Sequence, residues 1–175
     1  MKEIEVKILN VNKKEIEKKL LALGAEKNFD DNIDAIYYSI PQKKEKKKKT
    51  ALRLRQKGNI VELTYKHRTK TKCVKICDEY EVKVSDFEEM KKILKSLDYK
   101  IKTEIKKHRT SYHINNVHFE LDTYPNEPTL LEIEASNIKT IEKYVKLLSY
   151  TMKDAKGWSY AEILNYYKCE CKKKK

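Results

Sequence analysis

The chain has 175 residues, the size of a single domain, and its 39% apolar content can form a core only if the charged residues, 38% of the chain, are placed systematically. With 3 Gly, 3 Pro and no stretch near the roughly 20 apolar residues of a membrane span, the sequence excludes linker-like, collagen-like and membrane-inserted proteins. A charged strand pattern starts at Lys2, so we expect no secretory or transit segment and predict a cytoplasmic protein with no membrane partner.

Much of the net charge of +13 lies in two short segments. The run from Lys43 to Lys49 holds six lysines and one glutamate, and four lysines follow one another from Lys172 to Lys175. A solvated loop and a solvated tail are the expected state of these segments. Weak attraction of RNA or another polyanion is the alternative, and nucleic acid is otherwise not an expected partner.

The first half of the chain reads as strands around one amphipathic helix. Residues 2–9 alternate charged and apolar side chains, which is typical of a half-buried strand. Residues 12–23 are predicted to form a helix, with Asn12 as its N-cap and Gly24 just beyond its end. Further strands are expected at residues 33–40, 51–57, 60–67 and 73–84.

The second half continues the mixture of strands and helices. Residues 86–97 carry an apolar stripe at helical spacing. Strands are then expected at residues 99–112, 116–123 and 129–135, followed by helices at 138–149 and 157–167. The short connections favour antiparallel pairing, so the predicted class is α+β. We expect one domain over residues 1–167 and a basic, disordered tail over residues 168–175.

Charged side chains occupy every second position in most of these strands, so each strand has a charged face and an apolar or mixed face. An open sheet with one face in water would produce the same alternation. If helices instead cover the apolar faces and the sheet curls closed, the charged faces line an interior. That interior would contain Glu3, Glu5, Glu79, Glu81, Asp122, Glu132 and Glu134 together with Lys7, Arg53, Arg55, Lys66, Lys107 and Arg109.

A charged interior is costly if it stays dry and unpaired, but it suits water, a divalent metal and a polyanion. Clustered carboxylates favour a hard cation such as Mg²⁺ or Mn²⁺. Arginine forks match phosphate oxygens, and lysines add point charges. The set of opposed acids and bases is what a metal–triphosphate complex requires.

These motifs resemble those of the CYTH domain superfamily, the triphosphate tunnel metalloenzymes. The N-terminal Glu3-Ile-Glu5-Val-Lys7 resembles the family's ExExK signature, and its companions follow in the family's order over residues 2–167. They are Asp34-x-x-Tyr37-Tyr38, Leu52-Arg53-Leu54-Arg55, Leu63-Thr64-Tyr65-Lys66, Glu79-Tyr80-Glu81, Lys107-His108-Arg109, Glu120-Leu121-Asp122 and Glu132-Ile133-Glu134.

The resemblance implies an eight-stranded antiparallel closed β-barrel, the triphosphate tunnel, with helices packed outside. It implies a Mg²⁺ or Mn²⁺ site formed by Glu3, Glu5, Glu81, Asp122, Glu132 and Glu134. It places the substrate phosphates against Lys7, Arg53, Arg55, Lys66, Lys107 and Arg109. Lys107, which would position the attacking water, and Glu5 are the catalytic candidates, and a homodimer is a state that such proteins adopt.

The predicted function is therefore a metal-dependent triphosphatase that acts on a small linear triphosphate, namely tripolyphosphate, a nucleoside triphosphate or thiamine triphosphate. The alternative is an adenylyl cyclase of the class IV type, which would convert ATP to cyclic AMP and pyrophosphate. A third reading is a non-catalytic binder of polyanions or of RNA 5′-triphosphate ends.

Overall fold

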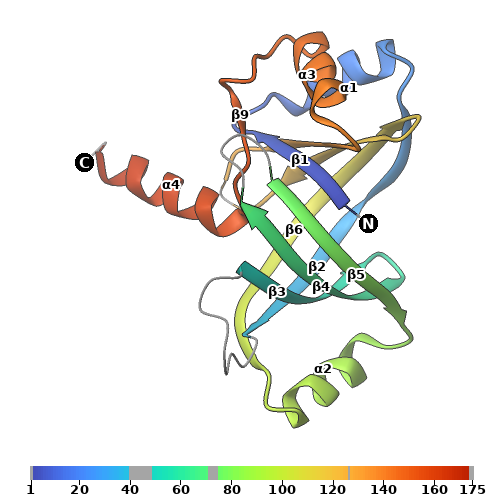
Figure 1. Ribbon diagram of the computed structural model, residues 1–175, viewed down its shortest axis with the longest axis vertical. Helices are drawn as coiled ribbons and strands as arrows, with labels where there is room; N and C mark the ends of the chain where they lie inside the picture. The colour runs from blue at the N-terminus through green and yellow to red at the C-terminus, as the bar shows by residue number, and fades with distance from the viewer. Residues whose placement is uncertain (1, 40–48, 71–74, 126, 174–175) are drawn as a thin grey trace.

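The structure is a computed structural model that describes residues 2–39, 49–70, 75–125 and 127–173 (Figure 1). In this part of the chain the strands are β1 (Lys2–Ile8), β2 (Glu26–Ser39), β3 (Lys49–Lys57), β4 (Ile60–Lys70), β5 (Lys75–Val84), β6 (Lys100–Ile114), β7 (Val117–Thr123), β8 (Leu130–Ala135) and β9 (Ala155–Lys156). The helices are α1 (Lys13–Ala22), α2 (Phe87–Ser96), α3 (Ile138–Leu147) and α4 (Tyr160–Lys173).

All the strands belong to one antiparallel sheet, in the order β5-β4-β3-β2-β6-β7-β8-β1-β9. β5 also pairs with β1, with Lys2 opposite Asp78 and Glu5 opposite Lys75. The predicted α+β class with a large antiparallel sheet is confirmed, whereas the closed eight-stranded barrel stays a prediction. The short β9, which the sequence analysis did not predict, adds a ninth strand through Lys7 and Ile8.

Local sequence signals explain where the helices begin and end. The side-chain oxygens of Asn12, Asp86 and Asn137 accept hydrogen bonds from backbone amides in the first turns of α1, α2 and α3. Gly24, just after α1, has a φ of +81°, a conformation that costs glycine little. The predicted first three helices are confirmed to within two residues at each end.

The two largest differences in element bounds from the sequence prediction concern β2 and α4. β2 begins at Glu26 rather than at residue 33, and the additional residues pair with the β6 residues from His113 back to His108. α4 continues to Lys173 and so includes most of the segment 168–175 that was predicted to be a disordered tail. Residues 174 and 175, like the run from Lys43 to Lys48, lie outside the described residues.

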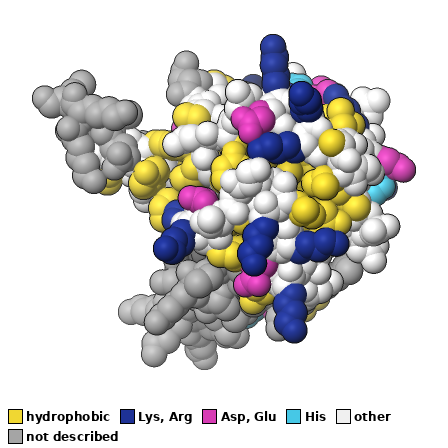
Figure 2. Space-filling model, turned by 90° about the horizontal axis from the view of Figure 1, so that it is seen from above, with side chains coloured by type: hydrophobic (Ala, Val, Ile, Leu, Met, Phe, Trp, Pro, Cys, Tyr) yellow, Lys and Arg dark blue, Asp and Glu magenta, His cyan; other side chains and the backbone are white. Residues whose placement is uncertain are grey.

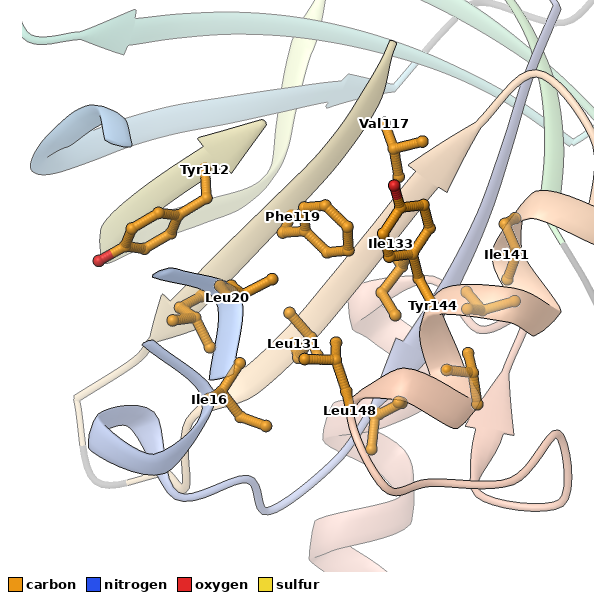
Figure 3. Packing of buried hydrophobic residues seen from close by; sticks show 14 of the residues in the cluster. Ile16, Leu20, Tyr112, Val117, Phe119, Leu131, Ile133, Ile141, Tyr144 and Leu148 are labelled. Carbon is orange, nitrogen blue, oxygen red and sulfur yellow. The ribbon is translucent and has the colours of Figure 1, made fainter. Parts of the chain in front are cut away.

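Two helices pack on the apolar face of β1, β7 and β8 and form the larger core. The sheet contributes Phe119, Leu131 and Ile133 to this core (Figure 3). Against them pack two residues of α1, Ile16 and Leu20, and three residues in or next to α3, Ile141, Tyr144 and Leu148. The Phe119 and Tyr144 rings meet edge to face with 5.1 Å between their centroids. This packing turns the charged positions of the same strands to the opposite face of the sheet.

A second, smaller core lies at the other end of the molecule, where α2 packs on β3 and its neighbours (Figure 1). Leu94 of α2 lies with Leu52, Leu54 and Ile36 in this cluster. The outer positions of β3 are thus occupied by leucines, and Arg53 and Arg55 point the other way. In the described residues, no helix combines the length and the apolar character that crossing a membrane requires.

Candidate active site

A cavity of about 840 Å³ lies against the charged face of the sheet. It is lined by all the predicted site residues whose side chains the structure describes; the side chain of Glu3 lies outside the described part of the chain. The lining residues that the sequence predicted are Glu5, Lys7, Arg53, Arg55, Lys66, Glu81, Lys107, Arg109, Asp122, Glu132 and Glu134. One space therefore receives side chains from β1, β3, β4, β5, β6, β7 and β8, as the alternation of charged and apolar residues in these strands predicts.

Asp122 binds two of the cations of the cavity, Arg109 and Lys107. Its side chain is fully buried and accepts hydrogen bonds from Arg109 through Nε to Oδ1 and Nη2 to Oδ2, both at 2.6 Å. Lys107 donates to the same carboxylate, and Arg109 also pairs with Glu120. This bidentate geometry fixes the guanidinium plane of Arg109. Asp122 thus neutralises part of the charge on both cations and orients them.

Lys7 lies between two carboxylates of the acidic side of the cavity. Its Nζ pairs with Glu5, two residues away on β1, and with Glu132 on β8 at 3.1 Å. Burial alone would lower the pKa of Lys7, but Glu132 and Glu5 outweigh it and the pKa is raised. Lys7 therefore stays charged throughout the physiological pH range and holds these carboxylates together.

The arginines of β3 are held by the neighbouring strand β4. Arg55 Nε donates to Glu62 at 2.9 Å, and Arg53 Nη2 donates to Thr64 Oγ1 at 3.1 Å. Glu81 on β5 lies 3.5 Å from Arg53 Nη2 and accepts a hydrogen bond from Thr64. In the described part of the chain, the buried Nε of Arg53 has no hydrogen-bond partner. A buried donor of this kind is usually satisfied by a ligand or by water.

Lys66 pairs with Glu79 on the adjacent strand. Glu81 is the most exposed of the acidic residues in these ion pairs of the cavity, with 38% of its side chain accessible. Its contacts are to Arg53, Arg55 and Thr64, so it lies on the arginine side of the cavity. The metal-binding role predicted for Glu81 stays a prediction.

Lys107 is largely buried, with 13% of its side chain accessible, and its pKa is lowered to about 8. Burial is the main cause and Arg109 adds to it, while Asp122 and Glu132 act in the opposite direction. The ammonium group therefore loses its proton as the pH rises through about 8, far below the usual range of lysine.

We expect the affinity for tripolyphosphate to fall as the pH rises through about 8, because the neutral amine of Lys107 no longer attracts the phosphate oxygens. Calorimetric titrations at pH values from 6.5 to about 9.5 would measure this. The Lys107→Ala variant should bind tripolyphosphate more weakly, and its affinity should show no fall as the pH rises through about 8. Lys106→Ala, which removes an exposed lysine from the next position of β6, should keep the fall. A fall that persists in Lys107→Ala would assign the titration to another group.

The carboxylates have the chemistry of a site for a hard divalent cation. Glu5 lies directly opposite Glu134, and Glu132 directly opposite Glu120. Like charges in such cross-strand positions destabilise a sheet, and a bound cation relieves the repulsion. As the side chains stand, no three potential ligands surround a single point among the described residues. Glu5, Glu132 and Glu134 line the cavity, and their carboxylate oxygens are of the ligand type that Mg²⁺ and Mn²⁺ prefer; their metal-binding role stays a prediction.

The start of α4 forms a wall of the cavity that the sequence analysis missed. Ser159, Tyr160 and Glu162 line it. Glu162 Oε2 accepts hydrogen bonds from the backbone N–H of Ser159 at 2.8 Å and from its Oγ at 2.7 Å, and the backbone contact caps the start of the helix. The Tyr160 ring stacks on Tyr124, with 4.3 Å between centroids and 13° between planes. Burial raises the pKa of Tyr160 to about 12, so this aromatic pair stays uncharged.

Comparisons with known proteins find relatives that match nearly the whole chain. "Putative adenylate cyclase MJ0240" from Methanocaldococcus jannaschii is 30% identical over 160 residues, which cover 90% of this chain and 89% of that protein. The solved PH1012 protein from Pyrococcus horikoshii is 29% identical with a TM-score of 0.78, over 91% of this chain and 98% of the other.

A more distant likeness concerns the fold alone. HpAC1 from Hippeastrum, a "putative adenylyl cyclase" described as having a dominant triphosphatase activity, has a TM-score of 0.64 at 14% identity. The match covers 94% of this chain and 95% of HpAC1.

The CYTH domain family profile matches residues 1–150. The chain belongs to the CYTH family.

Proposed function

We propose that the protein is a divalent-metal-dependent triphosphatase that hydrolyses a small linear triphosphate in the charged cavity. The observation that carries this proposal is the meeting of lysines and arginines from β1, β3, β4 and β6 with carboxylates from β1, β7 and β8 around one space. The enzymatic character of CYTH proteins and the triphosphatase activity of HpAC1 support it. The candidate substrates are tripolyphosphate, a nucleoside triphosphate and thiamine triphosphate.

The proposed site would be a tunnel enclosed by β1 to β8. The pairing of β5 with β1 supports this, since it connects the two strands that lie at opposite ends of the β5-to-β1 order. In such a tunnel, water is limited and electrostatic interactions with the phosphates strengthen. Helices α1, α3 and α2 lie on the other face of the sheet, which supports the helix-covered barrel that we expected (Figure 1).

In this proposal the chain's own cations bind and orient the triphosphate. Arg53 would use its free Nε, Arg55 and Lys66 would bind neighbouring oxygens, and Arg109 would stay fixed by Asp122. Glu5, Glu132 and Glu134 would hold Mg²⁺ or Mn²⁺, which when bound neutralises phosphate charge. Lys107 would position the water whose oxygen bonds to the terminal phosphorus as the bond to the bridging oxygen breaks.

The incubation series that tests this proposal uses the purified protein with Mg²⁺ or Mn²⁺ and each of the three substrates. We expect release of inorganic phosphate that requires the metal. The Glu5→Gln variant should lose at least ~100-fold of this activity, because it removes a charge from the metal-binding set. Glu88→Gln, an exposed carboxylate on α2, is the matched control and should be unaffected. Equal activity in Glu5→Gln and wild type would contradict the proposal.

Adenylyl cyclase activity is a second candidate, favoured by the name of the Methanocaldococcus jannaschii relative and by the Tyr124–Tyr160 pair in the cavity wall. An aromatic surface of this kind suits a planar base. Incubation with ATP separates the two reactions, because a cyclase releases cyclic AMP and pyrophosphate in equal amounts. No turnover of any substrate would favour the polyanion-binding alternative instead.

One end of the molecule offers little support for polyanion binding. On the end of the molecule that carries α1 and α3, Lys and Arg side chains are spread out, with apolar and acidic ones between them (Figure 2). The lysine run up to Lys48 and the last two residues lie outside the described part of the chain. If binding dominated, affinity for RNA would fall steeply with salt, and this is the observation that would favour it.

A further inference from the structure

Four side chains of metal-binding types form a row across the sheet, which we call the histidine row. Glu26 of β2 lies directly opposite His113 of β6, His113 directly opposite His118 of β7, and His118 directly opposite Glu134 of β8. Residues that face each other in this way have Cβ atoms about 4.5–5.5 Å apart and point to the same side of the sheet. Two imidazoles are thus placed next to each other with a carboxylate on either flank.

The contacts within the row support this arrangement. His113 Nε2 lies 3.7 Å from Glu26 Oε2, and His113 Nδ1 is buried and lacks a hydrogen-bond partner among the described residues. Burial lowers the pKa of His118, and the charges of His113 and Lys57 act in the same direction. His118 and Glu26 are exposed, so both can change rotamer without disturbing the core.

The row differs in chemistry from the cavity. Neither histidine lines the cavity, whose acidic side consists of carboxylates that suit Mg²⁺ or Mn²⁺. Imidazole nitrogens together with a carboxylate are typical ligands of Zn²⁺, and they bind cations of borderline character much better than Mg²⁺. The hairpin between β6 and β7 holds the two histidines in register, with Ile114 opposite Val117 at its end. The backbone register therefore places the two imidazoles next to each other, and rotation of their side chains would bring them to a shared cation.

We propose that the histidine row is a second metal site, which binds Zn²⁺ or a cation of similar preference through His113 and His118. Glu26 would supply a carboxylate oxygen after rotation of its exposed side chain, and water would complete the coordination. This site is independent of the proposed triphosphatase activity. It shares a boundary with the cavity, because Glu134 lies opposite both His118 and Glu5 on its two sides.

The test is calorimetric titration of the full chain with Zn²⁺, in buffer that contains millimolar Mg²⁺ to occupy the carboxylates. We expect one Zn²⁺ bound per chain at the row, with affinity reduced at least ~10-fold in His118→Ala and in His113→Ala. His108→Ala is the matched control, since that histidine lies in β6 beside Asp30, away from the row, and this variant should bind as the wild type does.

A second measurement tests the site in the wild-type protein and so needs no substitution. On addition of Zn²⁺ to wild-type protein, the imidazole nitrogen resonances of His113 and His118 should shift, and those of His67 and His108 should not. Unchanged zinc affinity in both His118→Ala and His113→Ala would overturn the proposal. So would zinc binding that is lost in Glu5→Gln but kept in the histidine variants, because the ion would then occupy the cavity.

Discussion

Replacing Asp122 with alanine is expected to lower the free energy of unfolding by about 3–5 kcal/mol, because it leaves buried cations without their partner. Asp122 is fully buried and accepts two hydrogen bonds from Arg109 and one from Lys107. Urea unfolding in the presence of a chelator, followed by circular dichroism, would measure the loss without any contribution from bound metal. Asp122→Asn keeps the shape and one acceptor and should lose less.

Asp34→Ala is the control for this experiment. Asp34 is exposed on β2 and lies 4.0 Å from Lys106, so its removal should change stability by no more than ~0.5 kcal/mol. An Asp122→Ala variant that is as stable as Asp34→Ala would show that water solvates Arg109 and Lys107 well enough to replace the carboxylate.

The same carboxylate gives stability a pH dependence of known sign. Burial would raise the pKa of Asp122, but Arg109 and Lys107 together lower it below the ordinary value of an aspartate. Its contribution to stability is therefore fully present above the unfolded-state pKa and is lost as the pH falls through the lower, folded-state value.

The second large effect is expected at Arg53. Arg53→Ala should weaken binding of tripolyphosphate by about 10–150-fold, since a hydrogen bond to a charged group contributes ~1.5–3 kcal/mol. The basis is the place of Arg53 in the cavity lining and its buried Nε, which has no partner within the described residues. Calorimetry of the metal-free protein would give the dissociation constants directly.

Two further variants separate charge from geometry at this position. Arg53→Lys keeps the charge but loses the planar fork, so it should recover only part of the affinity. Lys106→Ala removes one positive charge from the exposed side of β6 and should bind almost as the wild type does. If Arg53→Ala and Lys106→Ala weakened binding equally, long-range charge rather than a specific contact would explain the effect.

The strands were predictable because their charges alternate, and the same alternation identified most of the cavity lining. Leu52 and Leu54 could be assigned to a helix-covered face and Arg53 and Arg55 to the opposite one without any coordinates. The beginning of β2 was missed because Glu26 and the residues up to Asn32 include Asn and Asp, which are depleted in strands. Pairing with β6 overrides that local preference.

The missed parts of the site depend on which residues become neighbours. Glu62 and Glu120 hold arginines on adjacent strands, and only the strand register reveals these pairs. Tyr160 lines the cavity because α4 begins beside Tyr124, more than thirty residues earlier in the chain. An amphipathic helix pattern carries no signal for such a contact.

The pairing of β1 has a consequence for how the chain folds. β1 is synthesised before every strand that it pairs with, and its partners β5, β8 and β9 lie between residues 75 and 156. Pairings across such long stretches of sequence carry a high loop-closure cost and slow the rate-limiting step. Until those partners are made, the apolar side chains Ile4, Val6 and Ile8 have no sheet to join. Completion of the sheet around β1 is therefore a late event in folding, which depends on the last third of the chain.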